Sequence, residues 1–405
     1  NQLDLVDSLT TDSVVVSESI RGSFVDPLNP NRFALRETSG GRGIHIFNVS
    51  SGKFVEEEVR ETTKGPEAYA LYGKYTIYGV CDSDANGQNG SCSLVLNDGD
   101  TTSRTKVPTD IGGTNIAGLT VSKSGVVMAV VNANAYLYKI TDATVDTPPP
   151  SGGSQVVFVK EVYNYTDVPY WLGYSKPFTN TEWLSGGYFV VGGFCSIAKK
   201  YMPMSPRGVG NNIDIQGGLY AFKEDGTFVG RRNVCWDGDI PGSGQPSNAT
   251  PLICAEGLAC DVSDVMVPTG PNRFVRELVR PHGNEMGRPL IHYEVSASGI
   301  SILGKSHDGE RFGPAVSNPV LSGTTILAAK YKGNGTESFG SPKNVTYSLP
   351  LMGIVRESAI QITPIVSVGQ YIVGYPGNSG LTSLFKTKQA FVYRSRSDGT
   401  FEEVG

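Results

Sequence analysis

The feature that most constrains this chain is a short two-strand frame that recurs along it. Each copy has an alternating apolar stretch, a turn that ends in glycine, and a second stretch of alternating character. The four clearest copies are Gly43–Val55, Gly218–Val229, Leu290–Ile302 and Ala390–Phe401. Alternation with period two buries one face of a strand, and the turn glycine supplies the positive φ that a tight hairpin needs. The sequence therefore predicts repeated β-hairpins.

The composition agrees with an all-β chain. The 405 residues include 50 glycines, 24 prolines, 19 tyrosines and 16 phenylalanines. Glycine and proline break helices and populate turns, whereas aromatic and β-branched residues suit strands. No stretch of about twelve residues shows helical periodicity. The predicted fold class is all-β.

An apolar run precedes most of the hairpins. There are seven such runs: Arg32–Arg36, Tyr75–Val80, Val126–Val131, Tyr188–Phe194, Phe274–Val279, Thr325–Ala329 and Tyr371–Tyr375. The segments Ser93–Leu96, Tyr136–Ile140 and Val345–Leu349 supply the remaining first strands of hairpins. The seven groups recur at intervals of about 40 to 80 residues, which is typical of propeller blades.

This arrangement resembles a β-propeller with seven blades over essentially the whole chain. The resemblance is architectural and points to no particular family, because the chain lacks Trp-Asp blade endings. Ser395–Phe401 departs from the sialidase Asp-box, since Asp398 directly precedes Gly399 and no tryptophan follows. The alternatives are a pair of β-sandwiches and a β-helix.

A propeller has to close, and this requirement predicts a single domain over residues 1–405. Ser13–Ser17 forms a good strand with no partner near it, and Thr400–Val404 is the expected last strand of the seventh group. Pairing the two ends would remove an open sheet edge. We therefore expect the N-terminal strand to complete the C-terminal blade.

The six cysteines predict disulfides. Local geometry favours three pairs: Cys81 with Cys92, Cys195 with Cys235, and Cys254 with Cys260. No C-x₂-C spacing occurs and the four histidines lack zinc spacing, which disfavours a metal site of that type. Free buried thiols are the alternative. Disulfides indicate an oxidising compartment, so the protein is expected to be secreted or displayed at the cell surface.

Sites for N-glycosylation agree with that compartment. Six asparagines start an N-x-[ST] triplet: Asn48, Asn89, Asn164, Asn248, Asn334 and Asn344. Chance alone would supply about four, so their placement counts for more than their number. Asn48 falls in a predicted hairpin turn, while Asn89 and Asn334 lie in glycine-rich loops. Such loops accept glycans.

One loop resembles a calcium site. Asp82, Asp84 and Asn86 have the D-x-D-x-N-G spacing of EF-hand loops and of the loops in integrin α-chain propellers, and Gln88 would offer its carbonyl. The loop departs from both families, because Gly90 and Ser93 stand where closing carboxylates are expected. The alternative is an acidic hairpin tip held by Cys81 and Cys92. Calcium is the one cofactor that the sequence suggests.

Charge and hydropathy exclude two partner classes. The net charge is −5 with 18% charged residues and no basic cluster, whereas binding of the nucleic-acid backbone needs a basic face. The longest apolar run, Val126–Val131, is far shorter than the roughly 20 residues of a membrane helix. No signal peptide or lipidation motif is visible. The expected partners are other extracellular proteins or glycans, including further copies of the chain.

Two function classes remain. Long insertions at about 199–216 and 236–267 exceed what a blade needs, and Arg207, Asp214 and Trp236 within them are the expected binding residues. No catalytic motif is convincing; Gly377–Gly380 alone does not make a serine protease. We therefore interpret the chain as a non-catalytic scaffold for adhesion, receptor or glycan binding, or surface assembly. The alternative is a secreted hydrolase, lactonase-like or glycan-cleaving, with its site at the mouth of the central channel.

The calcium hypothesis makes a testable prediction. Replacing Asp84 with alanine should lower the melting temperature in millimolar calcium but leave it unchanged in a chelator, because only the bound form loses a ligand. Differential scanning fluorimetry of both proteins in both buffers measures this. Identical melting of the wild type with calcium and with chelator would show that the loop is only a turn held by a disulfide.

Overall fold

The computed structural model consists of β-strands and the turns between them. It describes residues 4–10, 25–36, 43–50, 53–62, 68–82, 91–107, 116–131, 134–141, 155–163, 178–193, 196–197, 215–216, 219–232, 262–278, 290–306, 315–331, 343–359, 362–376 and 389–394. Within these ranges there is no helix, and so none that could cross a membrane.

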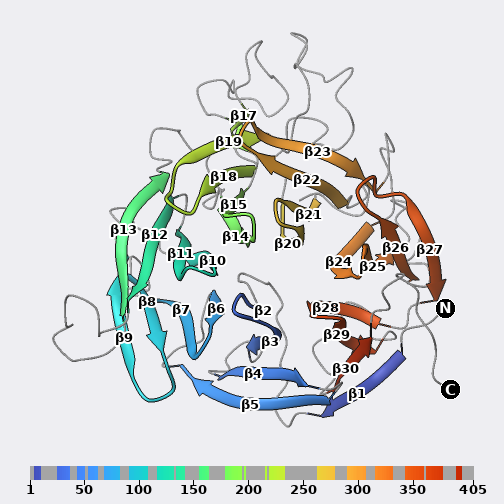
Figure 1. The fold of residues 1–405 in the computed structure, drawn as a ribbon, viewed down its shortest axis with the longest axis horizontal. Helices are drawn as coiled ribbons and strands as arrows, with labels where there is room; N and C mark the ends of the chain where they lie inside the picture. Colours follow the sequence, from blue (N-terminus) through green and yellow to red (C-terminus); the bar gives the residue numbers. More distant parts are fainter. Residues whose placement is uncertain are drawn as a thin grey trace, which may run out of the picture.

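Seven four-stranded antiparallel sheets stand in a ring around a central axis (Figure 1). In each blade the strands run from the axis outward in the order first to fourth. Blade 1 contains β2 (Val25–Asp26), β3 (Asn29–Arg36), β4 (Gly43–Ser50) and β5 (Lys53–Glu61). Blade 2 contains β6 (Tyr69–Tyr72), β7 (Tyr75–Cys81), β8 (Cys92–Asn97) and β9 (Thr102–Lys106). Blade 3 contains β10 (Ile116–Val121), β11 (Val126–Val131), β12 (Asn134–Thr141) and β13 (Gln155–Tyr163).

The other four blades repeat this plan. Blade 4 contains β14 (Phe178–Leu184), β15 (Tyr188–Gly193), β18 (Leu219–Lys223) and β19 (Phe228–Arg232). A two-stranded ribbon of β16 (Ser196–Ile197) and β17 (Ile215–Gln216) is inserted between β15 and β18. Blade 5 contains β20 (Val262–Gly270), β21 (Arg273–Leu278), β22 (Leu290–Ser296) and β23 (Gly299–Lys305). Blade 6 contains β24 (Ala315–Ser322), β25 (Thr325–Tyr331), β26 (Lys343–Ser348) and β27 (Ile354–Ala359). Blade 7 contains β28 (Ile362–Val368), β29 (Tyr371–Pro376), β30 (Gln389–Arg394) and β1 (Asp4–Thr10).

The predicted all-β class and the seven blades are confirmed. Each of the seven apolar runs forms the second strand of a blade. The first strand of each predicted hairpin forms the third strand of a blade. The innermost strands were not predicted. Several of them, such as Phe178–Leu184 and Ala315–Ser322, interrupt the apolar pattern with threonine, asparagine, serine or proline.

In blade 7, the outermost strand comes from the opposite end of the sequence. β1 pairs antiparallel with β30, from Asp4 opposite Arg394 to Thr10 opposite Gln389. It therefore occupies the position on β30 that was predicted for Thr400–Val404. The segments Ser13–Ser17 and Thr400–Val404 lie outside the described residues, and the closing strand is Asp4–Thr10 instead.

An aromatic residue on the third strand coincides with a β-bulge on the fourth strand in six blades. The aromatic residues are Phe47, Tyr138, Phe222, Tyr293, Tyr347 and Tyr393. In every case the register shifts by one residue immediately beside the pair that this aromatic residue forms. Blade 2 has Leu96 near the end of its third strand, and its β8–β9 ladder contains no shift. The aromatic position is the strongest part of the repeat in the sequence, and it marks where the outer strand bends.

The hydrophobic core lies between neighbouring blades. One cluster combines Phe33, Ile46 and Phe47 of blade 1 with Tyr69 and Tyr78 of blade 2, and it continues into blade 7. A second joins blades 2 and 3, and a third joins blades 3 and 4. Each blade therefore buries both of its faces, and no blade has a complete core of its own.

Hairpin tips of one blade also overlie the outer strand of the blade before it. The β26–β27 turn of blade 6 lies over Gly304 on β23, where an added Cβ would come within 2.5 Å of Leu351 C and Pro350 O. In the same way, Gly299 of blade 5 lies over Gly230 of blade 4, at 2.9 Å from the position of a Cβ. Glycine on the outer strand makes room for the backbone of the next tip.

Gly304→Ala should therefore destabilise the fold. The new methyl group would meet backbone atoms, which cannot rotate away, so we expect a loss of about 1–3 kcal/mol in the free energy of unfolding. Chemical unfolding followed by tryptophan fluorescence measures it. Gly270→Ala is the matched control, because its Cβ would meet nothing closer than 3.8 Å. Equal stability of the two variants would contradict the overlap.

Candidate functional site

The two faces of the ring differ in how their strands are joined. On one side, here called the turn face, the first strand joins the second and the third joins the fourth. The seven turns between first and second strands are short: 27–28, 73–74, 122–125, 185–187, 271–272, 323–324 and 369–370. Five of the connections between third and fourth strands, 51–52, 98–101, 224–227, 297–298 and 349–353, are also short. The turn face is thus built mainly from tight hairpins.

The opposite side, here called the loop face, receives the long connections. There the second strand joins the third, and the fourth joins the next blade. The longest connections are 11–24, 164–177, 194–218, 233–261, 279–289, 332–342 and 377–388. Only 142–154, between β12 and β13, is a long connection at the turn face. Most of the long connections therefore begin and end on the loop face.

A series of hydrogen bonds joins one blade to the next on the turn face. Arg32 of blade 1 donates to the carbonyl of Gly73 in blade 2. The Tyr72 hydroxyl donates to Lys123 O in blade 3 at 3.1 Å. The series continues with Ser124 Oγ to Glu224 Oε2 (2.6 Å), Gly186 N to Pro271 O (2.6 Å), His292 Nδ1 to Pro350 O (2.9 Å), and Ser367 Oγ to Leu321 O. Every junction from blade 1 to blade 7 has such a contact.

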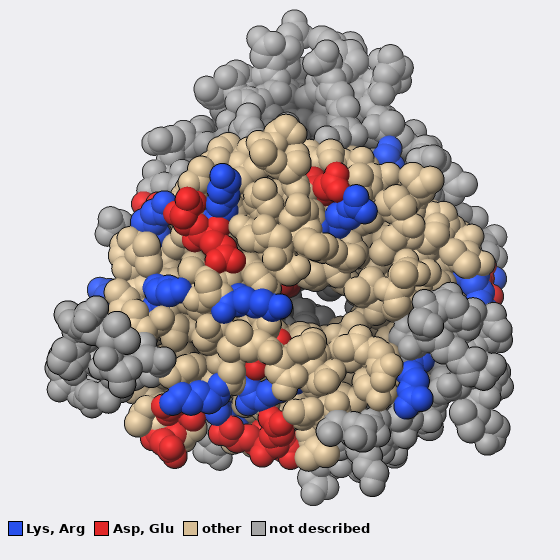
Figure 2. Space-filling view, in the orientation of Figure 1, with Lys and Arg blue, Asp and Glu red and all other residues tan. Residues whose placement is uncertain are grey.

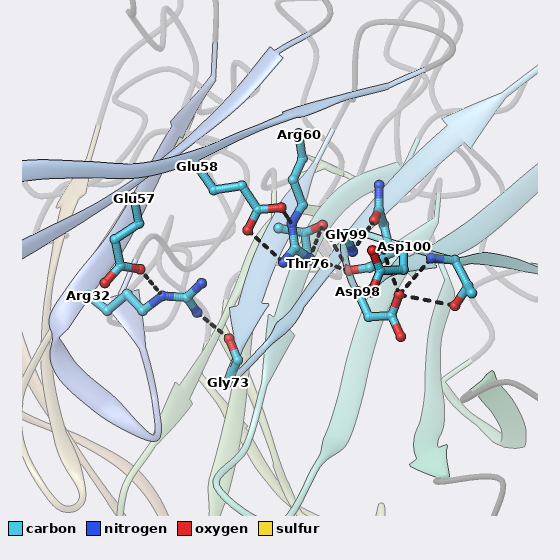
Figure 3. Close-up of polar contacts among 11 residues, drawn as sticks. Arg32, Glu57, Glu58, Arg60, Gly73, Thr76, Asp98, Gly99 and Asp100 are labelled. Carbon is cyan, nitrogen blue, oxygen red and sulfur yellow. Dashed lines mark hydrogen bonds and ion pairs between the residues drawn. The ribbon is translucent and has the colours of Figure 1, made fainter.

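The junction of blades 1 and 2 carries the densest polar cluster (Figure 3). Arg60 is 5% exposed, and its guanidinium donates to both oxygens of Glu58 at 2.7 and 2.9 Å. It reaches across the junction to Asn97 O at 2.5 Å and Thr76 Oγ1 at 3.5 Å. Bidentate, charge-assisted contacts of this kind are the strong ones. The cluster holds two blades together, and its charges are already matched within the chain.

Arg32 forms a second contact of this type beside the first. It donates to Glu57 Oε2 at 2.7 Å and lies 3.3 Å from Asp26 Oδ2, whose carboxylate is buried. Asp26 in turn accepts from the backbone N–H of Leu28 and of Gly73. The buried carboxylate therefore positions the arginine and the turn, and it is not free to bind a ligand.

The centre of the ring is open in the space-filling view (Figure 2). The innermost strands bring largely apolar or small residues to it, for example Tyr-Ala-Leu-Tyr in β6 and Ile-Ala-Gly-Leu-Thr-Val in β10. Across the described ranges, no three histidine, cysteine, aspartate or glutamate residues come together as a metal site would require. Acidic residues also lie on innermost strands, among them Asp26 on β2, whose carboxylate lies 3.3 Å from Arg32, and Glu182 on β14.

Most of the sequence-predicted site residues lie outside the described residues. These are Asp84, Asn86, Gln88, Asn89, Asn164, Cys195, Arg207, Asp214, Cys235, Trp236, Asn248, Cys254, Cys260 and Asn334. The structure joins Cys81 to Cys92 by a disulfide across the ends of β7 and β8, with a Cα–Cα distance of 4.0 Å. Asp82 is exposed, with Arg104 Nη1 3.7 Å from its carboxylate.

Two predicted glycosylation sites are described, and both lie in strands. Asn48 is within β4 and not in the turn that follows it, and its Nδ2 donates to Glu57 Oε1 at 2.9 Å. Asn344 on β26 is 5% exposed. Its Nδ2 donates to Ile362 O at 2.8 Å, and its Oδ1 accepts from Ile362 N at 3.2 Å. Asn344 therefore joins blades 6 and 7 in the folded chain, and a glycan on Nδ2 would compete with that contact.

Sequence reasoning missed the polar residues that join neighbouring blades, or that hold such a residue in place. Ser124, Glu224, Thr269 and Ser367 look like ordinary turn or strand residues in the sequence. Trp183 is partly buried against blades 3 and 4, and its Nε1 donates to Glu224 Oε1 at 3.0 Å. Only the three-dimensional neighbours give these residues a role, and no spacing signal marks them.

These features define the class of the protein as a seven-bladed β-propeller. No protein-family model matches the chain, and no curated protein sequence matches it. Similar solved structures include a protein from Lactobacillus plantarum, with 11% identity, a TM-score of 0.49 and coverage of 92% of this chain and 94% of that chain. Others are a chain of the Mitotic Checkpoint Complex (11% identity, TM-score 0.47, covering 97% and 95%) and the Dos1 propeller (13%, 0.46, 99% and 96%). These likenesses concern the fold alone.

One junction should respond to pH. His292 is 1% exposed. Its Nδ1 carries a proton, because Nδ1 donates to the carbonyl oxygen of Pro350. In the neutral ring Nε2 therefore has no proton, and it accepts a hydrogen bond from Thr269 Oγ1 at 2.9 Å. Burial lowers the pKa of His292 below its usual value. The unfolded chain then binds a proton below about pH 6.5 while the folded chain does not, so this stability is present above that pH and is lost as the pH falls.

We expect His292→Asn to lose less stability than the wild type between about pH 7.5 and about pH 5, because the titrating group is gone. Urea unfolding at several pH values measures the difference. Thr269→Val keeps the imidazole and should retain a pH dependence of the wild-type sign. An unchanged slope in His292→Asn would show that other groups account for the acid sensitivity.

Proposed function

We propose that this chain is a non-catalytic extracellular scaffold that binds a partner protein or glycan through its loop face. The observation that carries the proposal is the difference between the two faces. Hydrogen bonds tie the turn face together from blade to blade, while the long connections start and end on the loop face. Rigid scaffolds commonly carry recognition on such connections.

The two largest connections on the loop face are neighbours in the ring. Residues 194–218 lie between β15 and β18 of blade 4, and residues 233–261 join blade 4 to blade 5. They contain the predicted insertions at 199–216 and 236–267, except that Val262–Gly270 is the innermost strand of blade 5. Arg207, Asp214 and Trp236 belong to these two connections. Both connections leave strands of blade 4.

The extracellular part of the proposal is supported by cysteine usage and by the acceptor triplets. Cys81 and Cys92 are disulfide-bonded, which suits an oxidising compartment. The glycan acceptors at Asn89, Asn164, Asn248 and Asn334 belong to connections at the loop face. A glycosylated loop face would restrict binding to the surface between the glycans.

The test is binding of the labelled, secreted protein to the surface of the cells that express it, followed by flow cytometry. Replacing Arg207, Asp214 or Trp236 with alanine should weaken binding by about tenfold where the residue is a central contact, without lowering the melting temperature. Lys123→Ala and Thr324→Ala are matched controls in exposed turns of the turn face.

The assignment of the face would be overturned if the turn-face controls lost binding while the loop variants kept it. Hydrolysis of model lactones or glycosides by the purified wild type, abolished by the loop variants, would overturn the non-catalytic role. Retention of the protein inside the cell, with its cysteines reduced, would overturn the extracellular role.

A further inference from the structure

The outer strand of blade 2 is unlike the others. In every blade the fourth strand is an edge, with backbone groups directed away from the sheet. In six blades a bulge interrupts this edge, so that another strand pairs with it less readily. β9 pairs with β8 without any shift in register, from Thr102 opposite Asn97 to Lys106 opposite Ser93. It is the one regular edge among the seven outer strands that the structure describes.

The ladder defines which backbone groups of β9 point outward. Two hydrogen bonds show which residues face β8: Val107 N donates to Cys92 O, and Asp98 N donates to Thr101 O. Every second residue between them has the same orientation, so the residues with backbone groups directed toward β8 are Thr101, Ser103, Thr105 and Val107. In an antiparallel ladder the intervening residues direct theirs away. Thr102, Arg104 and Lys106 therefore present N–H and C=O groups on the free edge, where no described strand pairs with them.

Both ends of this edge are held in place. At the turn, Asp98 accepts hydrogen bonds from the N–H of Asp100 (3.2 Å) and of Thr101 (2.7 Å), and Gly99 N donates to Asn97 Oδ1 at 2.8 Å (Figure 3). At the other end, Val107 N donates to Cys92 O at 2.9 Å, and the disulfide fixes β8 to β7. A strand that is already in place loses less conformational freedom when a second strand is added to it.

The side chains on this edge give it a charge. Thr102, Arg104 and Lys106 are the exposed residues of β9, while Ser103 and Thr105 are only partly exposed. Arg104 is 48% exposed, and its Nη1 lies 3.7 Å from the exposed carboxylate of Asp82. Asp98 is engaged by Lys74 and the turn, at the far end of the strand. Two basic side chains thus stand at alternate positions beside the outward backbone groups.

We propose that β9 is a docking edge for an extended, acidic segment of a partner polypeptide, which adds antiparallel to β9 as a fifth strand of blade 2. Backbone hydrogen bonds to Thr102, Arg104 and Lys106 supply the pairing. Acidic side chains at every second position of the added strand lie opposite Arg104 and Lys106, and such opposite charges stabilise cross-strand pairs. The edge is separate from the loop face, so the proposal does not rest on the proposed function.

The most apolar outer strand is a poorer template than β9. Val157, Phe158 and Val159 on β13 are between 38% and 52% exposed, which would favour association. Two shifts in register interrupt that strand, one of them next to Phe158. Its outward groups therefore do not form the even row that strand addition requires.

The test uses fluorescence anisotropy with a labelled short peptide of alternating threonine and aspartate residues. Two control peptides are needed: one with lysine in place of aspartate, and one with N-methylated backbone on the pairing side. We expect the acidic peptide to bind, more weakly as salt is raised, and neither control peptide to bind.

Two variants separate backbone pairing from charge. Arg104→Pro removes an N–H that points away from β8, a position where edge strands tolerate proline, and should weaken binding by about tenfold. Arg104→Thr keeps the N–H and loses the charge, so it should bind more weakly than the wild type and with less dependence on salt. Melting temperatures show whether each variant is folded.

Several outcomes would overturn the proposal. These are equal binding of the acidic and lysine peptides, binding of the N-methylated peptide, or wild-type affinity in Arg104→Pro. Should Arg104→Pro not fold, the N-methylated peptide decides on its own. Dimerisation of the wild type that Arg104→Pro abolishes would make a second copy of the chain the occupant, and would overturn the assignment of an acidic partner.

Discussion

The structure depends on the contacts between neighbouring blades. A single four-stranded sheet leaves two apolar faces uncovered, and in this chain each face is covered only by the next blade in the ring. At the turn face, every junction from blade 1 to blade 7 adds a hydrogen bond between blades, and most of these are accepted by a backbone carbonyl. A backbone carbonyl acceptor places little constraint on the sequence, because every residue has one. The donors can therefore differ from junction to junction: arginine, tyrosine, serine, a backbone N–H and histidine.

This explains which parts of the fold could be predicted from the sequence. Residues such as Phe47, Tyr293 and Tyr393 recur because the third strand of a blade needs a large buried side chain opposite the bulge, so the repeat is visible without any structure. The innermost strands carry no such signal, since β24 and β28 each contain a proline and β14 has four consecutive polar residues. An N-terminal strand was predicted to complete the last blade, but the prediction named Ser13–Ser17 and not Asp4–Thr10 as that strand. A strand paired across the whole length of the chain has no local signature, and Asp4–Thr10 is less apolar than Ser13–Ser17.

The candidate site is less accessible to sequence reasoning than the fold. Insertions 199–216 and 236–267 stand out by length, yet length says nothing of what Arg207, Asp214 or Trp236 would contact. Spacing rules also treat residues as independent of their surroundings. Asn344 satisfies the acceptor triplet, but its amide forms two hydrogen bonds with Ile362 of the next blade. A triplet records what an enzyme can modify in an extended chain, whereas the fold decides whether the side chain is already in use.

Blade 2 shows how one departure from the repeat can create a separate surface. Leu96 near the end of its third strand replaces the aromatic residue of the other blades, and its fourth strand has no bulge. The physical link is that a bulge re-aims one backbone group and increases the local twist, so its absence leaves the outward groups of β9 in an even row. An even, exposed row is a hazard for aggregation unless charge protects it. Arg104 and Lys106 provide that protection against other copies of the same edge, because like charges would face each other. The same two charges favour an acidic strand, so a residue pattern that prevents self-association also selects the partner.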